Sequence, residues 1–595
     1  MTSVSPALAL AARLADPMSR DILAPTIATD ALATSEDAAA FAALLRRNRV
    51  SLLPAKALRP PQMQVLLETE PFAIYVQEEE RAYAQVRQEY GTIRAAFAAA
   101  GLVDVLIKSA GMAPSFPHLS DNVDDLVPAD GVATARAALR ALGYVELRNL
   151  EEPRKFFFKR FSGGQQVAAH HLHEHVGWAV SFLDEQLLLR RVRPAADDNE
   201  LLIPHPEDAF LITTAHALYE NKAFKLGDLV KVRHCLRSGQ LDWPRMRDLT
   251  AAKGWLDGLD VLIAAFSRLD AAIYGDTLFP ADVVRQAAQG LSGAHRTYVD
   301  DLFSGELAMP LRVSFGFSKR LFYAKCWHDR GRSTRGRVYD IVRHTLNGAK
   351  LKLRIHSQPG MLVTLSGVDG SGKTQHARAL ENAFELCDIR AHYVWSRSGS
   401  SRLTDAFVGL AKSVLRRPPS APGSTQEQRA SGRREMARSP LVRQVWTALV
   451  CLDLIWQYAG RVGLPLLRGR VVICDRYTYD AIADLAAMSG RAGGFWPRLL
   501  IALSPKPALR YLISVPAVVV AARRQDEQLS EDSISQQAAV YAALARQYGL
   551  AIVNNALPFA EANDPLVRQA IRTFFARYRT LINGVFMANP EASSQ

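Results

Sequence analysis

Cysteine is scarce in this sequence, with five residues in 595, and no two of them have the C-x-x-C spacing of zinc sites. So scattered a set argues against a zinc ribbon and a disulfide framework, and it fits a reducing compartment. Long apolar runs are missing as well, because the stretch from Tyr511 to Ala522 is too short for a membrane span and contains Pro516. The apolar stretch Ala7–Ala12 has no basic residue before it, which makes it a poor signal peptide. We therefore expect a cytoplasmic protein without a membrane span.

No recognisable nucleic-acid reader motif is present, so nucleic-acid binding is possible but has no clear support in the sequence. What the sequence does have is a net charge of +13, which suits a protein that handles phosphorylated or otherwise acidic ligands. The same charge is equally compatible with a solvated basic surface. At 595 residues, the chain is long enough for three or four compact units.

The clearest motif follows the apolar run Met361–Leu365. Gly367-Val-Asp-Gly-Ser-Gly-Lys-Thr374 has the pattern G-x-x-x-x-G-K-[ST], and a helical pattern comes after it. Glycines let backbone N–H groups curl round a phosphate, and the helix N-terminus adds partial positive charge. Lys373 is then expected to reach the β- and γ-phosphates, and the Thr374 hydroxyl to ligate Mg²⁺. We predict a nucleotide-binding site at Gly367, Asp369, Gly370, Ser371, Gly372, Lys373 and Thr374.

Strand and helix patterns alternate through the C-terminal half, which is typical of a doubly wound α/β fold with a parallel sheet. The run Val471–Cys474 does not alternate with polar residues, as expected for a strand buried on both faces, and Asp475-Arg-Tyr477 follows it. The stretch from about 416 to 439 is rich in Pro, Ser, Gly and Arg, which predicts a mobile surface insertion. The expected strands are 361–365, 390–395, 471–474, 508–514 and 551–554.

The glycine loop, together with Asp475-Arg-Tyr477, is similar to the thymidylate kinase family. The segment Leu512–Pro516 with the arginines after it, and Val540-Tyr541, add to the resemblance, which covers about 358–580. It implies a P-loop kinase that uses ATP and Mg²⁺ and transfers the γ-phosphoryl group in line, by positioning and charge stabilisation.

The resemblance also implies roles for individual residues. Lys373, Asp475 and Arg476 would be catalytic, with Asp475 helping to hold Mg²⁺ through water and Arg476 clamping phosphate. Arg523 and Arg524 would come from a lid that closes over ATP. Asp369, Arg397, Arg476 and Tyr477 would bind the acceptor substrate.

Four departures from the family concern the acceptor. The family has a phenylalanine that stacks on thymine and an arginine four residues later, and the matching positions here are Val450 and Leu454. Neither side chain can stack on or hydrogen-bond a base. The family serine after the tyrosine becomes Asp480, and the glutamate before the first glycine becomes Ser366. We therefore expect a small-molecule or saccharide acceptor rather than dTMP. A genuine dTMP kinase and an ATP-gated binding or scaffold protein are the alternatives.

The N-terminal half contains the segments Val105–Lys108, Asn122–Val127, Ala138–Tyr144 and His171–His173. They resemble an uncharacterised nucleotidyltransferase-like family over about 35–310, with His216 as the central histidine of its helical domain. Two-metal transfer needs acidic residues two apart on one strand face. Here the matching positions hold Asn122 and Asp124, and His171 replaces the third carboxylate, so we expect a degenerate site with Asp124 as its one remaining metal ligand.

Alternation would place His171, His173 and His175 on one strand face, as metal ligands or as ordinary strand residues.

The N-terminal half would bind the acceptor or regulate the kinase, and a homodimer is left open. We divide the chain into a partly ordered lead-in (1–35), a nucleotidyltransferase-like α+β domain (36–200), a helical domain (201–310), a basic connector (311–357), a thymidylate kinase-like domain (358–580) and a tail (581–595).

Overall fold

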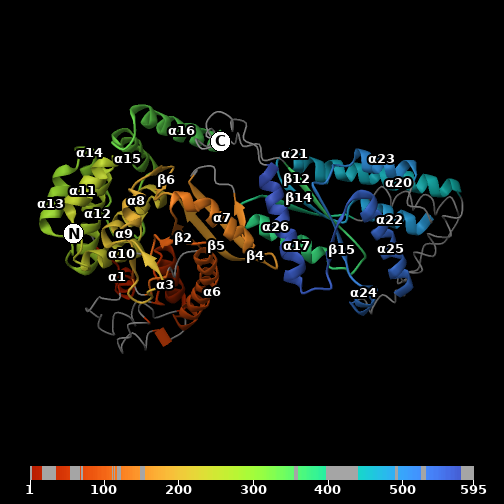
Figure 1. The fold of residues 1–595 in the computed structure, drawn as a ribbon, viewed down its shortest axis with the longest axis horizontal. Coiled ribbons are helices and arrows are strands. Elements are labelled where there is room, and N and C mark those ends of the chain that lie inside the picture. Colours follow the sequence, from red (N-terminus) through yellow and green to blue (C-terminus); the bar gives the residue numbers. More distant parts are fainter. Residues whose placement is uncertain are drawn as a thin grey trace. The chain divides into compact units, whose positions relative to one another are not determined.

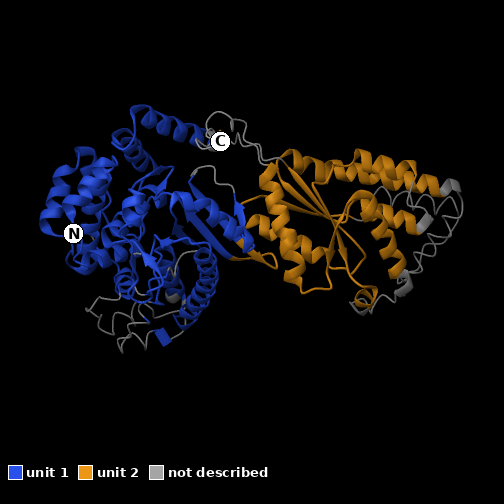
Figure 2. Ribbon diagram, in the orientation of Figure 1, with its two compact units in different colours: residues 1–159, 168–352 blue, residues 160–167, 353–595 orange. Residues whose placement is uncertain are grey.

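The computed structural model describes residues 3–16, 35–53, 56, 67–68, 72–109, 111–112, 114–116, 122–147, 154–353, 360–396, 440–489, 494–523 and 531–577. It separates into two compact units (Figure 2). The first unit comprises residues 1–159 and 168–352, and the second comprises residues 160–167 and 353–595. The predicted insertion at about 416–439 and the predicted tail lie outside the described residues.

The first unit contains a mixed five-stranded sheet with the strand order β1-β2-β5-β4-β3 (Figure 1). β2 and β5 are parallel, whereas β1 pairs with β2 and β3 pairs with β4 in the antiparallel sense. The helices α6 and α7 contribute Phe97 and Leu139 to an apolar cluster with Phe158 and Leu172 of the sheet. The elements are β1 (Val105–Leu106), β2 (Val123–Leu126), β3 (Val145–Leu147), β4 (Lys155–Ser162), β5 (Gln165–His173), α6 (Phe72–Ala99) and α7 (Val132–Ala141).

Helices make up the rest of the first unit. Every residue of α9 is buried, so this helix has no solvent face and lies at the centre of the helical part. The predicted lead-in contains α1, which buries Leu8, Leu10 and Leu14. The predicted connector contains α15 and α16. The helices are α1 (Pro6–Ala15), α3 (Ser35–Arg47), α8 (Glu185–Leu189), α9 (Pro206–Ala215), α10 (Leu226–Arg237), α11 (Trp243–Ala252), α12 (Leu256–Tyr274), α13 (Ala281–Gly290), α14 (Gly293–Asp301), α15 (Phe315–His328) and α16 (Thr334–Leu353).

Short elements connect these parts of the first unit. Among them is a π-helix, η2, directly after α9, and such turns are frequent at functional sites. The short elements are η1 (Ala129–Gly131), η2 (His216–Asn221), β6 (Gly177–Trp178), β7 (Val180–Ser181), β8 (Arg193–Pro194), β9 (Leu202–Ile203), β10 (Ala223–Phe224) and β11 (Leu311–Arg312).

The second unit has an α/β fold around a five-stranded parallel sheet, in the order β13-β14-β12-β15-β16. All five predicted strands are confirmed, because each predicted range agrees with one strand of the sheet to within one residue at either end. The elements are β12 (Met361–Ser366), β13 (Ala391–Trp395), β14 (Val471–Asp475), β15 (Leu509–Ser514), β16 (Ala551–Asn554), α17 (Lys373–Glu385), α20 (Pro440–Tyr458), η3 (Ala459–Gly463), α21 (Leu464–Leu467), α22 (Thr478–Ser489), α23 (Phe495–Leu503), α24 (Ala517–Arg523), α25 (Glu531–Tyr548) and α26 (Phe559–Arg577).

The order of the strands decides where a ligand can bind. β12 lies in the middle of the sheet, between β14 and β15, so the loop after β12 emerges beside the ends of both neighbours. The carboxyl edge of a parallel sheet is the usual place for a ligand in this fold class.

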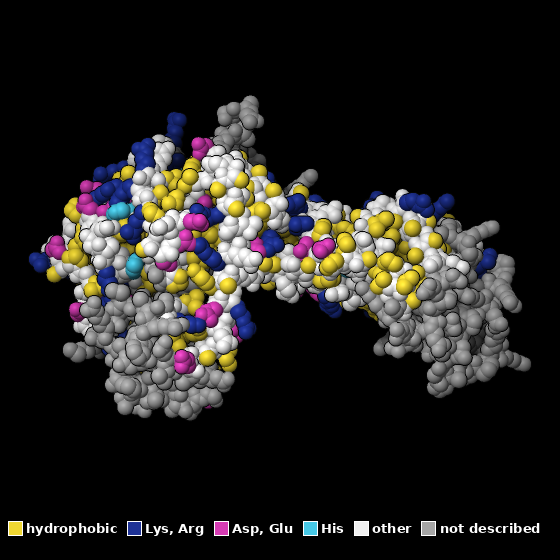
Figure 3. Space-filling view, turned by 60° about the horizontal axis from the view of Figure 1, so that its bottom comes forward, with side chains coloured by type: hydrophobic (Ala, Val, Ile, Leu, Met, Phe, Trp, Pro, Cys, Tyr) yellow, Lys and Arg dark blue, Asp and Glu magenta, His cyan; other side chains and the backbone are white. Residues whose placement is uncertain are grey.

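On the surface in Figure 3, Lys and Arg side chains are interspersed with acidic and apolar ones. Among the described residues, no helix is both long and apolar enough to span a membrane.

Candidate functional site

The glycine loop connects β12 to α17, and two of its glycines occupy positions that no other residue fits. Gly367 has φ +149°, and a Cβ there would lie 2.5 Å from the carbonyl oxygen of Ile513. Gly372 has φ +95°, and a Cβ there would lie 2.4 Å from Nδ2 of Asn555. L-residues rarely adopt such φ values, and either side chain would also collide with a neighbour. The loop conformation therefore depends on glycine at both ends.

Lys373 folds back over this loop. Its Nζ donates to the carbonyl oxygens of Gly367 and Val368, at 2.8 and 2.9 Å, and lies 3.6 Å from Asp369. Burial lowers the pKa of Lys373, although Asp480 and Asp369 act in the opposite direction. The ammonium group thus has carbonyl partners that a phosphate oxygen can replace without leaving it unsatisfied.

Asp475 ends β14 directly beside Leu365 of β12. Thr374 Oγ1 donates to Asp475 Oδ2 at 2.5 Å, and the Tyr393 hydroxyl donates to the same oxygen at 2.9 Å. The other carboxylate oxygen, Oδ1, is buried and has no hydrogen-bond partner among the described residues. A hydroxyl beside a carboxylate with a spare oxygen fits Mg²⁺, which prefers oxygen ligands.

Arg476 and Asp369 form an ion pair across the loop. Burial alone would lower the pKa of Arg476, but Asp369 raises it above its usual value, so the guanidinium stays charged. Arg476 has φ +72°, a strained backbone conformation of the kind that gathers at functional sites. Tyr477 behaves differently: its ring is 2% exposed, and its hydroxyl donates to the carbonyl of Pro505 at 2.6 Å. The structure therefore brings Arg476 to the loop but places the Tyr477 side chain in the core.

Asp480 is a fully buried carboxylate that holds the start of the loop. Four donors meet it: the Ser366 hydroxyl (2.6 Å), the Gly367 N–H (3.3 Å), the Tyr477 N–H (2.9 Å) and the Tyr541 hydroxyl (3.0 Å). Burial raises the pKa of Asp480, although Lys373 and the bond from Ser366 lower it. The two family departures, Ser366 and Asp480, thus contact each other.

Replacing Asp480 by Asn tests this arrangement. All four partners donate hydrogen bonds to the carboxylate. The NH₂ group of an asparagine would replace one of the two accepting oxygens, and its N–H groups would then face the N–H and O–H groups of the partners. We expect the substitution to lower the free energy of unfolding by about 1–3 kcal/mol and to weaken nucleotide binding. Urea unfolding and ATP titration measure the two effects. Asp453→Asn is the matched control, because Asp453 accepts one bond, from Gln457 of the same helix. Equal behaviour of the two variants would contradict a positioning role for Asp480.

Three buried residues that the sequence did not suggest also hold the loop. Asn555, just after β16, donates to the carbonyl of Ser371 at 2.7 Å. His376 lies between Asn555 and Asn563, with ring nitrogens 2.9 and 3.0 Å from their side-chain oxygens. The one sequence signal was the position of Asn555 at a strand end, on the edge that carries the loop.

Other predicted residues are placed less completely. Arg397 and Arg524 lie outside the described residues, as does the side chain of Arg523. Val450 and Leu454 are 2% and 0% exposed and belong to the apolar core of the second unit. They are therefore not available to a ligand in this conformation.

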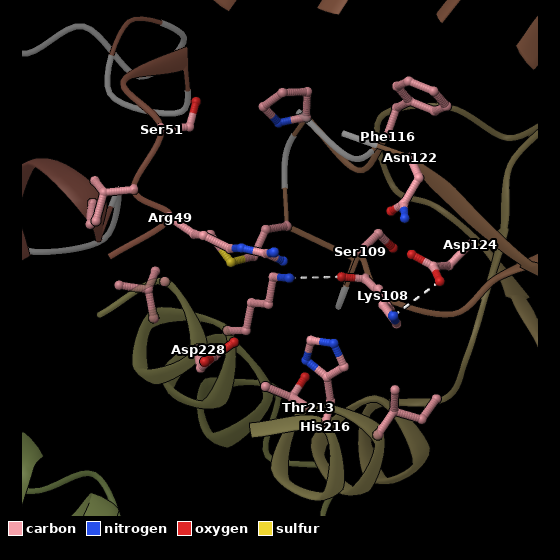
Figure 4. A pocket seen from close by; sticks show the side chains of 18 residues that line it. Arg49, Ser51, Lys108, Ser109, Phe116, Asn122, Asp124, Thr213, His216 and Asp228 are labelled. Carbon is pink, nitrogen blue, oxygen red and sulfur yellow. Dashed lines mark hydrogen bonds and ion pairs between the residues drawn. The ribbon is translucent and has the colours of Figure 1, made fainter. Parts of the chain in front are cut away.

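The first unit contains a separate pocket (Figure 4). Basic side chains of Arg49, Lys108 and Lys231 line it together with His216, and Lys231 Nζ donates to the carbonyl of Lys108 at 2.8 Å. Asn122 and Asp124, at two of the positions that match the metal ligands of the family, also line the pocket and lie on the same side of it as Lys108. The lining also includes Ser51, Thr213, Gly227 and Asp228, to which the sequence assigned no role.

Asp124 is the most heavily contacted carboxylate of this pocket. Lys108 Nζ lies 3.0 Å and His173 Nε2 lies 2.8 Å from its Oδ1, and His171 Nδ1 lies 3.4 Å away. Burial alone would raise the pKa of Asp124, but Lys108 and the two histidines hold it well below its usual range. Burial also lowers the pKa of His173 to about 4, so its ring is neutral near pH 7.

Neighbouring residues extend this cluster. Glu220, on the π-helix η2, lies 3.7 Å from Lys108, 3.1 Å from Lys155 and 3.1 Å from His216. The sequence did not suggest Glu220 or Lys155. The predicted alignment of three histidines on one face is wrong for His175, because β5 ends at His173 and His175 instead contacts Glu185 at 3.3 Å.

Comparisons with known proteins give a family match for the N-terminal half and several curated relatives that are thymidylate kinases. Residues 34–268 match the model of a family described as an uncharacterised nucleotidyltransferase, which confirms the resemblance of the N-terminal half. The chain is also 28% identical over 159 residues to a probable thymidylate kinase of Pyrococcus abyssi, spanning 26% of this chain and 66% of that protein, slightly under two thirds. A thymidylate kinase of Xanthomonas campestris pv. campestris is 28% identical over 193 residues, 31% of this chain and 72% of that protein.

Proposed function

We propose that the second unit is a P-loop phosphotransferase that moves the γ-phosphoryl group of ATP to an acceptor, with Mg²⁺ as cofactor. The observation that carries this proposal is the hydrogen bond from Thr374 to Asp475, which joins the glycine loop to the end of the neighbouring strand. The similarity to thymidylate kinases supports the same class of reaction.

In this proposal, the loop N–H groups and the start of α17 receive the phosphates. Lys373 exchanges its two carbonyl partners for phosphate oxygens and neutralises their charge. Thr374 and Asp475 would hold Mg²⁺, which offsets negative charge on the phosphates when it is bound. Arg476, oriented by Asp369, reaches the transferred group, and the lid arginines Arg523 and Arg524 close the site. The chain contributes positioning and charge, with no covalent enzyme intermediate.

The acceptor in this proposal is a small molecule or saccharide rather than dTMP. Val450 and Leu454 occupy the positions where the family reads the base, and both lie in the apolar core. The first unit would bind that acceptor or regulate the kinase. We further propose that the protein acts in the cytoplasm. We also propose that its domains have the boundaries expected from the sequence.

ADP release by the purified full chain tests the proposal. Assays contain Mg·ATP alone, or with dTMP, or with a panel of sugars and sugar phosphates. We expect turnover that dTMP does not stimulate and that a member of the panel does. Strong stimulation by dTMP would instead identify a thymidylate kinase, and it would overturn our argument from Val450 and Leu454. ATP binding without ADP release under any condition would indicate an ATP-gated binding protein and overturn the phosphotransferase.

A further inference from the structure

The metal-site positions of the first unit do not fit the pair of magnesium ions that nucleotidyl transfer uses. Two such ions need several carboxylates around them. Of the matching positions, only Asp124 supplies one, since Asn122 is an amide and His171 an imidazole. The Lys108 ammonium, 3.0 Å from Asp124, would also repel divalent ions here, and a pair of them more strongly than one.

The residues that are present offer a different set of ligands. β2 and β5 are parallel with Asp124 directly beside His171, and His173 lies two residues on, so all three share one face of the sheet. Their nearest ligand atoms all lie within 4.8 Å of one another. Two paired strands hold these ligands in place, so little ordering is needed for an ion to bind. Imidazole nitrogens with one carboxylate suit zinc-class transition metals rather than magnesium.

We propose that Asp124, His171 and His173 bind one divalent transition-metal ion of the zinc class, in competition with the ammonium group of Lys108. This site is independent of the kinase proposed above, because all of its ligands belong to the first unit.

The competition follows from the contacts of Asp124. Lys108, His171 and His173 all approach its Oδ1 atom, so the oxygen nearest to the two histidine ligands is also the one that Lys108 contacts. Lys108 has a second carboxylate available, because Glu220 Oε2 lies 3.7 Å from its Nζ. Glu220 also contacts Lys155, so it is already part of a charged network that can keep Lys108 paired when the ion binds. Removing the Lys108 charge should therefore strengthen metal binding.

Cobalt(II) is a suitable probe, because its visible absorption is much stronger in tetrahedral sites with imidazole ligands than in octahedral oxygen sites. The full chain, without nucleotide, is titrated with Co²⁺ and then with Zn²⁺ as a competitor. We expect one Co²⁺ per chain with the intense spectrum, displaced by Zn²⁺ but not by an equal concentration of Mg²⁺. His171→Gln and Asp124→Asn should each weaken binding by at least about tenfold. Asp475→Asn, in the second unit, should leave this spectrum unchanged.

Two further variants make the test specific. His175→Gln is the matched control, because His175 belongs to the same segment but lies outside the three ligands, and it should bind Co²⁺ like the wild type. Lys108→Met should bind about tenfold more tightly, a gain that misfolding cannot produce. The proposal is overturned if the ligand variants bind like the wild type, if the wild type shows no intense spectrum, if Mg²⁺ competes as well as Zn²⁺, or if Lys108→Met binds more weakly.

Discussion

Lys373→Ala is expected to abolish measurable ATP turnover, with a loss of at least about 10²–10³ in kcat, the magnitude typical of removing one preorganised donor to a developing charge. The reason is positional as well as electrostatic. Lys373 is 5% exposed, and its Nζ already lies against the loop carbonyls, so it approaches bound phosphate without a search through conformations.

For Lys373→Ala, ADP release measures the loss of turnover, and ATP titration measures the loss of ATP binding. Because the alanine side chain has no ammonium group to offer the phosphates, ATP binding is expected to weaken along with turnover. Lys506→Ala is the matched control, since Lys506 is an exposed lysine at the start of the segment that leads into β15. Full activity of Lys373→Ala would refute the assignment of the loop as the phosphate site.

Gly372→Ala is the second substitution with a large expected effect. It places a Cβ 2.4 Å from Asn555 Nδ2 in a backbone with φ +95°, so the loop must shift away from the side chain that fixes the Ser371 carbonyl. We expect strain of about 1–3 kcal/mol together with loss of ATP binding. Isothermal titration with ATP, combined with thermal unfolding, measures both.

The chain offers a close control for this substitution. Gly549 also has positive φ, at +66°, but a Cβ there would meet nothing within 4 Å. Gly549→Ala should therefore cost comparable backbone strain and leave ATP affinity unchanged. If both variants lost ATP binding to the same extent, the effect would come from general destabilisation, and the argument from Asn555 would fail.

Much of the second unit could be predicted from sequence because its signals are local. Strands buried on both faces, such as Val471–Cys474, appear as unbroken apolar runs. Lys373 and Thr374 belong to one short motif, and the end of β14 supplies Asp475 immediately after its apolar run. Each of these predictions needed a window of a few residues, and the structure places all three residues together.

The supporting residues could not be predicted in the same way, since their roles arise from distant pairings. His376 meets Asn555 across 179 positions in the sequence, and no local pattern marks either residue. Glu220 reaches Lys108 and Lys155 from a π-helix, whose extra residue per turn changes the direction of each side chain after it. His175 was misplaced for a simpler reason: alternation holds within a strand, and β5 ends at His173.

The central position of β12 also governs when the loop can take shape during synthesis. Thr374 lies 101 positions before its partner Asp475, and Ser371 lies 184 positions before Asn555. Contacts so distant in sequence form late and slow the folding of a domain. When the glycine loop leaves the ribosome, Asp475 and Asn555 have not yet been synthesised, so the loop lacks the residues that hold it in the folded protein. The loop is therefore fully supported only when nearly the whole second unit has been translated, and any nucleotide binding by it would have to wait until then.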